Sequence, residues 1–366
     1  MTDLGEEGFA LPELAASGDD AVQFHQELHA THLMGLWDVG PEQVPRVPHP
    51  KARPYRWRWQ ELSRLAALSW RFVPVEQGPS RRVHGRVLAL VNPASTNFGT
   101  TDTLFAGIQS LLPGETLLAH RHSMQAIRFV LAGHGASTTV DGEQLAMESG
   151  DFLLTPAGMW HQHHNPSSSG LPMIWLDGLD LPLVDKLAAT FFEPFPGNEL
   201  PVGDTAASVG FAEVGIGPTN WQAGQAGTSL LRYPWTETRR ALEAEARATT
   251  TGIVEMEFTN PLTGGAVLPT MSCGIMLLEA GVARAQCREV DSTILLVFRG
   301  QGYSVINGER FSWEQGDVVA VPSWAWAEHV AERSPNEKPA ILFTMTERPA
   351  LQALGLYRRE EATEGQ

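Results

Sequence analysis

The sequence predicts a mostly β protein built from two copies of one small barrel, with helical segments before and between them. Short apolar runs broken by Gly, Pro, Asp-Gly or Asn-Gly turns fill residues 83–180 and again 251–347, a pattern typical of sandwiches and barrels. The two regions also repeat each other. Hydrophobic residues make up 43% of the chain and charged residues only 19%, so the chain can bury a core and is not mainly disordered.

The repeat consists of turn residues that recur in the same order. In the first copy they are Gly114, Gly133, Asp141-Gly142, Gly150-Asp151, Pro156 and Trp160. In the second copy, after one single-residue gap, they are Gly281, Gly300, Asn307-Gly308, Gly316-Asp317, Pro322 and Trp326. The Asp-Gly and Asn-Gly pairs predict type I′ hairpins. The ordered agreement indicates a duplicated domain.

The remaining elements follow from periodicity and composition. Helices are predicted at 12–35, 58–72 and 236–248, with a proline-rich extended passage at 41–54. Strands of the first copy are predicted at 86–91, 126–131, 136–140, 152–155 and 173–176. We therefore expect an N-terminal helical and extended arm (1–82), a first barrel (83–180), a helical linker (181–250), a second barrel (251–347) and a C-terminal tail (348–366).

Charge and cysteine content exclude several classes of protein. The 26 Lys and Arg residues stand against 42 Asp and Glu, a net charge of -16, which excludes nucleic acid as the main partner. The two cysteines provide no disulfide framework. The N-terminus lacks the basic and apolar regions of a signal peptide, and no apolar run reaches the ~18 residues of a membrane span. We expect a cytoplasmic protein without a membrane partner.

A group of histidines in the first copy is the strongest chemical signal. In a strand, residues i and i+2 face the same side, so His120 and His122 point together. His161, from a neighbouring strand, would complete a set of three imidazoles, which suits Fe, Zn, Cu, Ni or Mn. The alternative is a polar strand face, or core histidines bonded to carbonyls.

The surrounding residues favour the metal. The segments 114–133 and 150–165 resemble the two signature motifs of the cupin superfamily, in which these histidines bind one ion inside a β-barrel. The usual glutamate ligand of that family falls at Ala126, which cannot coordinate. The resemblance therefore implies three neutral imidazoles around an ion that keeps its +2 charge and about three open positions. In the second copy the matching residues are Cys287, Glu289 and Ala327, and we expect no metal there.

The resemblance extends over nearly the whole chain. Segments 118–135, 150–165, 174–183 and 321–329 are similar to the gentisate 1,2-dioxygenase family, which includes the salicylate and 1-hydroxy-2-naphthoate dioxygenases. This resemblance implies a bicupin, with two double-stranded β-helix (jelly-roll) barrels, that assembles as a homotetramer. It also implies one Fe(II) per subunit in the first barrel, and O2 as the second substrate. An aromatic hydroxy acid would chelate the ion through its carboxylate and phenolate oxygens.

Further residues are expected to bind the substrate. Strand alternation points Arg128 into the barrel, where its counterpart in the second copy is Leu295. Because a buried arginine needs an anionic partner, we expect it to bind the substrate carboxylate, the alternative being an ion pair with Asp177. The resemblance adds His163 and Asp177 as catalytic residues beside Arg128. It adds four substrate-binding residues: Arg86, Gln109, Trp160, and Phe105, which replaces the tryptophan usual in the family.

Three functions remain open from the sequence. The first is Fe(II)-dependent ring cleavage of gentisate to maleylpyruvate, between the carboxyl-bearing and hydroxyl-bearing carbons. The second is the same chemistry on salicylate or 1-hydroxy-2-naphthoate. The third, from another class, is a non-catalytic metal-binding cupin that binds a small aromatic acid. Because a site built around the 5-hydroxyl of gentisate would reject salicylate, the choice depends on polar groups that the sequence does not place.

Overall fold

The computed structural model describes residues 21–73, 75, 85–197, 199–203, 230–333 and 338–362. Its residues group into two units, Met1–Pro48 and His49–Gln366. Across the described ranges no helix is both long enough and apolar enough to cross a bilayer. Both cysteines are buried and free.

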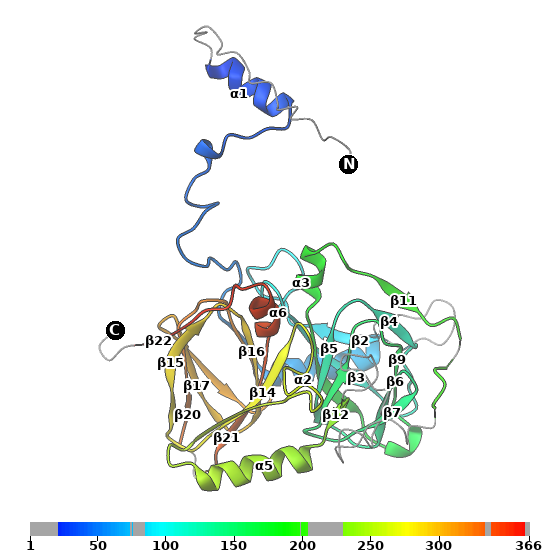
Figure 1. The fold of residues 1–366 in the computed structure, drawn as a ribbon. Coiled ribbons are helices and arrows are strands. Elements are labelled where there is room, and N and C mark those ends of the chain that lie inside the picture. The colour runs from blue at the N-terminus through cyan, green and yellow to red at the C-terminus, as the bar shows by residue number, and fades with distance from the viewer. Residues whose placement is uncertain are drawn as a thin grey trace, which may run out of the picture. The chain divides into compact units, whose positions relative to one another are not determined.

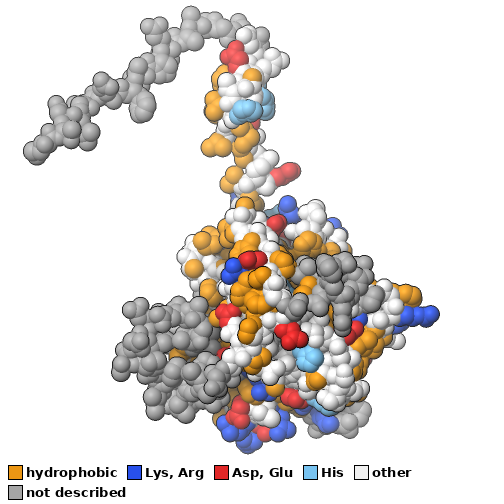
Figure 2. Space-filling view, turned by 90° about the vertical axis from the view of Figure 1, so that its right-hand side faces the viewer, with side chains coloured by type: hydrophobic (Ala, Val, Ile, Leu, Met, Phe, Trp, Pro, Cys, Tyr) orange, Lys and Arg blue, Asp and Glu red, His pale blue; other side chains and the backbone are white. Residues whose placement is uncertain are grey.

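Among its described residues, 21–48, the N-terminal unit has no buried hydrophobic side chain. It contains helix α1 (Ala21–Ala30) and the 3-10 helix η1 (Leu36–Asp38). The helix expected at 12–35 is wrong at its C-terminal end, and its first part, 12–20, lies outside the described residues. The helix stops because His32 adopts a left-handed φ of 57° and Leu33 N–H bonds back to Leu28 O. Hydrophobic side chains, including Leu36 and Trp37, stay exposed in this unit (Figure 2).

The first barrel consists of two sheets. Its strands are β2 (Arg86–Ala89), β3 (Phe105–Leu111), β4 (His120–His122), β5 (Ala126–Ala132), β6 (Ala136–Val140), β7 (Glu143–Met147), β8 (Phe152–Thr155), β9 (His161–His164), β10 (Met173–Leu179), β11 (Phe192–Pro194) and β12 (Arg232–Tyr233). The 6-stranded sheet has the order β12-β8-β5-β10-β3-β2, and the 5-stranded sheet the order β11-β4-β9-β6-β7. The five strands predicted for this copy are confirmed.

The second barrel repeats the first beside it (Figure 1). Its strands are β1 (Tyr55–Trp57), β13 (Ile253–Glu257), β14 (Ser272–Leu278), β15 (Ala283–Glu289), β16 (Thr293–Arg299), β17 (Gln301–Ile306), β18 (Glu309–Glu314), β19 (Val318–Val321), β20 (Ala327–Ala331), β21 (Ala340–Thr346) and β22 (Arg359–Glu361). They form sheets β1-β19-β16-β21-β14-β13 and β18-β17-β20-β15-β22. The predicted duplication and bicupin fold are confirmed.

Both predicted hairpins have the backbone that type I′ turns require. Asp141 and Gly142 have φ values of 44° and 90°, and Asn307 and Gly308 have 50° and 83°. Positive φ at both central positions matches the right-handed twist of the flanking strands. The hairpins join β6 to β7 and β17 to β18 in register.

In each barrel, one edge strand comes from the segment that precedes the other barrel in the sequence. Strand β1, from the N-terminal arm, pairs with β19, and β12, from the linker, pairs with β8. A tryptophan follows each strand, and its backbone N–H donates to an aspartate carboxylate: Trp59 to Asp317 at 2.7 Å, and Trp235 to Asp151 at 2.8 Å. Helices α2 (Trp59–Phe72) and α5 (Trp235–Ala248) then start at these tryptophans, close to their predicted bounds. The repeat therefore includes the arms, which the sequence analysis missed.

The two 6-stranded sheets pack together through an aromatic core. Phe343 of β21 lies 4.5 Å from Phe129 and 5.5 Å from Phe152, measured between ring centroids. Gly178 of β10 allows the closest approach, since a Cβ there would lie 2.3 Å from the Met345 sulfur. Buried side chains of both barrels belong to this one core, so packing against the second barrel stabilises the first.

A short helix follows the matching strands β10 and β21: α3 (Leu181–Lys186) and α6 (Arg348–Ala353). The residue just before α6, Glu347, is buried, and it accepts hydrogen bonds from Ser292 N–H and from Thr103 of the other barrel. Burial, with Asp291 nearby, raises the pKa of Glu347 from 4.5 to about 7.

This shift predicts a pH dependence of stability. Because the folded pKa lies above the unfolded one, the contribution of Glu347 to the free energy of unfolding is fully present below about pH 4.5 and is lost as pH rises to about 7, by roughly 3 kcal/mol at most. We expect Glu347→Gln to flatten the denaturant-unfolding profile between these pH values. A mutant profile as steep as that of the wild type would contradict this assignment.

Candidate metal centre and substrate pocket

Three histidines of the first barrel come together in its interior. His120 and His122 lie on β4, and His161 lies on β9 directly opposite His120 in the register of the two strands. One ring nitrogen from each lies within 4.8 Å of the others, and all three residues are buried. Among the described residues this is the only group of three or more His, Cys, Asp or Glu placed to hold an ion.

The hydrogen bonds of these rings fit a metal. The Nδ1–H of each donates to a carbonyl two residues away along the chain, on Leu118, Met124 and Met159, at 2.7, 2.9 and 3.1 Å. Such bonds leave Nε2 as the lone-pair nitrogen and fix the ring orientation. The Nε2 atom of His161 is buried without a hydrogen-bond partner among the described residues. Burial, followed by the electrostatic effects of His120 and Arg128, lowers the pKa of His161 well below 6.5, so its imidazole is neutral.

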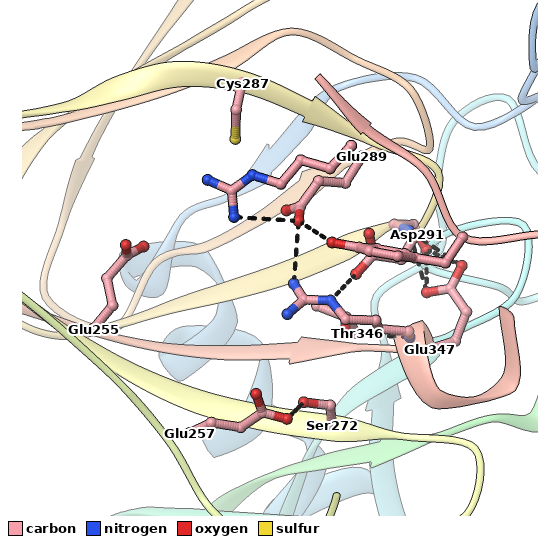
Figure 3. Close-up of polar contacts among 12 residues, drawn as sticks. Glu255, Glu257, Ser272, Cys287, Glu289, Asp291, Thr346 and Glu347 are labelled. Atoms are coloured by element: carbon pink, nitrogen blue, oxygen red, sulfur yellow. Dashed lines mark hydrogen bonds and ion pairs between the residues drawn. The ribbon is translucent and has the colours of Figure 1, made fainter. Parts of the chain in front are cut away.

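The matching residues of the second barrel have other contacts. Cys287 and Glu289 occupy the places of His120 and His122. Glu289 accepts from the Tyr357 hydroxyl at 2.7 Å, and Figure 3 shows its carboxylate joined to neighbouring side chains. Ala327 stands where His161 does.

A cavity of about 360 Å³ opens beside the three histidines, within the usual range of ligand pockets. Ala126, at the position of the missing glutamate, lines it. Its apolar walls are Val87, Phe98, Phe105, Met124, Ala126, Leu179, Leu181 and Phe192. Its polar residues are Gln109, Arg128, His163, Asp177, Thr190 and the three histidines.

Arg128 lines the cavity and also forms an ion pair with Asp177. It lines the cavity, as strand alternation predicts, and its Nε also lies 3.3 Å from Asp177 Oδ1. Its Nη1 donates to Thr155. Burial raises the pKa of Asp177 to about 6, against the opposing effects of Arg128 and the Trp175 indole N–H, which donates to the carboxylate at 2.9 Å. The ion pair and the cavity position therefore coexist, since a guanidinium has five N–H donors.

Three other predicted residues also reach the cavity. His163 follows His161 on the same face of β9, and its Nδ1 lies 2.9 Å from the Thr138 hydroxyl. Gln109 and Phe105 lie on β3, four residues apart and therefore on one face. The structure thus brings His163, Gln109 and Phe105 to the same space as the metal centre.

Two predicted substrate-binding residues lie elsewhere. Arg86 donates to Glu115 and to Val73 O at 3.2 Å, and it does not line the cavity. Its neighbour Val87 does, because adjacent strand residues face opposite sides.

Trp160 faces away from the cavity for the same reason. It precedes His161 and faces outward, where Arg121 lies 4.5 Å over its ring and Phe195 packs against it. Neither Arg86 nor Trp160 lines the cavity in this structure, and their roles in substrate binding stay predictions.

Several residues of the pocket were not predicted from the sequence. Phe192, on β11 of the linker, stacks on the His120 ring with centroids 4.9 Å apart. Leu181 begins α3, and Phe98 lies in the loop before β3. The aromatic Phe191-Phe192 pair in the linker was the only local signal. The repeat could not reveal these positions, because they lie outside the copied turns.

Fold and site together define a bicupin with one three-histidine metal centre, in its first barrel. A family model described as a cupin domain matches residues 107–177. The chain is 35% identical over 352 residues to 5-aminosalicylate 1,2-dioxygenase from Comamonas sp, covering 93% of this chain and 90% of that protein. It is 35% identical over 345 residues to gentisate 1,2 dioxygenase 1 from Aquipseudomonas alcaligenes, covering 92% and 95%.

A solved structure agrees over the full length. Salicylate 1,2-dioxygenase from Pseudoaminobacter salicylatoxidans, as an adduct with gentisate, matches with a TM-score of 0.83 and 34% identity, covering 100% of this chain and 99% of that one. The chain belongs to the gentisate 1,2-dioxygenase family of bicupins. By this membership it is an aromatic ring-cleaving dioxygenase, and the non-catalytic alternative is set aside.

Proposed function

We propose that this enzyme uses Fe(II), held by His120, His122 and His161, to cleave gentisate with O2 to maleylpyruvate. The observation that carries the proposal is one cavity that contains both a three-imidazole centre and a buried arginine. Such a cavity can bind a 2-hydroxybenzoate at the metal and at its carboxylate together. Iron itself rests on the family, because three imidazoles suit several divalent ions.

The chain's own residues would bind and orient the acid. The Arg128 guanidinium, held by Thr155 and Asp177, lines the cavity and would bind the carboxylate of the acid. Iron held by the three histidines would supply Lewis-acid chemistry, lowering the pKa of the phenol and bringing the phenol together with O2. The His163 ring, anchored through Thr138, is in place to hydrogen-bond the substrate. The apolar walls exclude water and strengthen these contacts.

Asp177 is proposed to act on the substrate mainly by positioning Arg128. Its Oδ1 is already engaged by Arg128 and by the Trp175 indole. Gln109 and Thr190 are the further polar residues of the cavity that support recognition of a second ring hydroxyl, the group that gentisate has and salicylate lacks.

A second substrate is supported by the walls. Phe98, Phe105 and Phe192, with Leu179 and Leu181, make most of the cavity apolar. Contact with an apolar wall favours the second aromatic ring of 1-hydroxy-2-naphthoate, whereas a hydroxyl buried there finds no hydrogen-bond partner in the wall. This acid is therefore the alternative to gentisate.

A substrate panel tests the proposal. Full-length protein loaded anaerobically with Fe(II) is mixed with gentisate, salicylate or 1-hydroxy-2-naphthoate, and O2 consumption and the ultraviolet absorbance of the product are followed. We expect kcat/KM to be highest for gentisate, by at least about tenfold over salicylate, since a polar partner is otherwise left unpaired. A preference for the naphthoate would favour the alternative, and no O2 uptake with any of the three would overturn the proposal.

We also propose a homotetramer, as the family resemblance implies. In the N-terminal unit, Val22, Phe24, Leu33, Met34, Leu36 and Trp37 are each about half exposed or more. Apolar surface of this kind is typical of a protein contact.

A further inference from the structure

Two matching hydrogen bonds cross between the barrels. The Thr270 hydroxyl, from the second barrel, donates to Asp180 Oδ2 in the first at 2.5 Å. The Thr103 hydroxyl, from the first barrel, donates to Glu347 Oε1 in the second at 2.8 Å. The two threonines occupy matching positions of the repeat, as do the two acids, each of which directly precedes a short helix.

Each carboxylate also holds a bend of its own barrel. Asp180 Oδ1 accepts from Gln125 N–H at 2.9 Å, and Glu347 accepts from Ser292 N–H at 3.1 Å. Figure 3 shows dashed contacts at the Glu347 carboxylate, beside Asp291. We name the series Thr270–Asp180–Gln125 the first latch and the series Thr103–Glu347–Ser292 the second latch.

The latches differ in what the bend supports. In the first, the residue before Gln125 is Met124, whose carbonyl accepts the Nδ1–H of His122 at 2.9 Å. In the second, the residue before Ser292 is Asp291, and the counterpart of His122 is Glu289. Only the first latch continues to a metal-binding imidazole.

We propose that Thr270 is a positioning residue for the metal centre, through which the second barrel holds the His122 imidazole in place. The inference rests on the three-histidine centre binding a divalent ion, and not on which ring is cleaved. It gives the second barrel a role in the chemistry of the first.

Burial makes this contact effective. Asp180 is 1% exposed, so removing the threonine hydroxyl leaves Oδ2 without that donor where water does not readily replace it. The bend at 123–125 then loses a fixed anchor, and with it the carbonyl that orients His122. Loss of a partner that orients a metal-binding histidine usually costs 10- to 100-fold in metal affinity.

The second latch provides a matched control. We compare Thr270→Val with Thr103→Val, the same substitution at matching positions. Valine keeps the backbone carbonyl of Thr103, which accepts from Leu183 N–H. Each metal-free full-length variant is titrated with Co²⁺ against a competing chelator, and its thermal unfolding is recorded.

Both variants are expected to unfold a few degrees below the wild type, since each loses one hydrogen bond to a buried acidic residue. Only Thr270→Val should weaken Co²⁺ binding, by about tenfold, while Thr103→Val stays within about twofold of the wild type. Thr270→Ser, which restores the hydroxyl, should restore the affinity. Thr270→Ala carries the same expectation should the valine variant not fold.

The outcomes separate this inference from the proposed reaction. Wild-type Co²⁺ affinity in folded Thr270→Val or Thr270→Ala, or equal weakening in both latches, overturns the inference alone. A wild type that binds no divalent ion overturns the three-histidine centre and the inference with it. Selective weakening in Thr270→Val supports the inference even if no aromatic acid is cleaved, a result that would overturn the proposed function only.

Discussion

Replacing His161 with alanine is expected to remove both the bound metal and ring cleavage. The residue is fully buried, lies opposite His120, and has an Nε2 atom without a hydrogen-bond partner among the described residues. With Ala126 at the position of the usual glutamate, the centre has no protein carboxylate to compensate. Because losing a residue that merely orients a ligand costs 10- to 100-fold in affinity, losing the ligand itself should cost more than about 100-fold. Metal content after dialysis and O2 uptake measure the two effects.

His164→Ala is the matched control for this experiment. His164 lies on the same strand but is exposed, and its Nδ1 contacts the Thr116 hydroxyl at 2.7 Å. It should keep its metal and its turnover. A His161→Ala protein that retains stoichiometric iron would show that the third ligand is misplaced, and a His164→Ala protein that loses iron would show that the whole strand, and not one ring, is required.

Replacing Arg128 with methionine is expected to separate substrate binding from metal binding. Methionine keeps much of the apolar length of the side chain and removes the guanidinium that faces the cavity. Truncating one partner of a buried charge pair costs about 2–5 kcal/mol. We therefore expect kcat/KM for the aromatic acid to fall by roughly 100- to 1000-fold. Bound iron should stay at the wild-type level, because Arg128 holds none of the imidazoles. Steady-state kinetics and metal analysis on one preparation check both.

Arg121→Met is the control for charge alone. Arg121 lies between two metal-binding residues in the sequence but points outward, where it pairs with Glu193 and covers Trp160. Its removal should leave KM unchanged. An unchanged KM in Arg128→Met would leave only the ion pair with Asp177 as the role of that arginine, which was the alternative reading of its burial. Wild-type KM in Arg121→Met together with a raised KM in Arg128→Met would support carboxylate capture.

Local spacing made the metal centre predictable. The i, i+2 separation of His120 and His122 places both rings on one face of a strand, whatever the rest of the chain does. The turn residues of the repeat fixed the hairpins for a similar reason, since Asp-Gly and Asn-Gly pairs select a backbone conformation by themselves. Arg128 followed from the same alternation.

The alternation of strand residues was not used for the two predicted residues that lie outside the cavity. Arg86 and Trp160 were assigned by resemblance, and each adjoins a residue that faces the cavity, so each faces away from it. Strand parity would have excluded Trp160, which stands next to His161. For Arg86 the parity of the strand was not known until Val87 was seen to line the cavity.

The amino-acid sequence by itself determined the duplication, the hairpins and the three imidazoles, because these depend on residues close together in the chain. Only the tertiary structure decided which distant segments complete each barrel and its pocket: β1 and β12 pair with the opposite barrel, β11 brings Phe192 onto His120, and Thr270 reaches Asp180. These contacts join residues of different repeats or of the linker. Their choice depends on how two apolar sheets pack, and the periodicity of a single strand does not specify that packing.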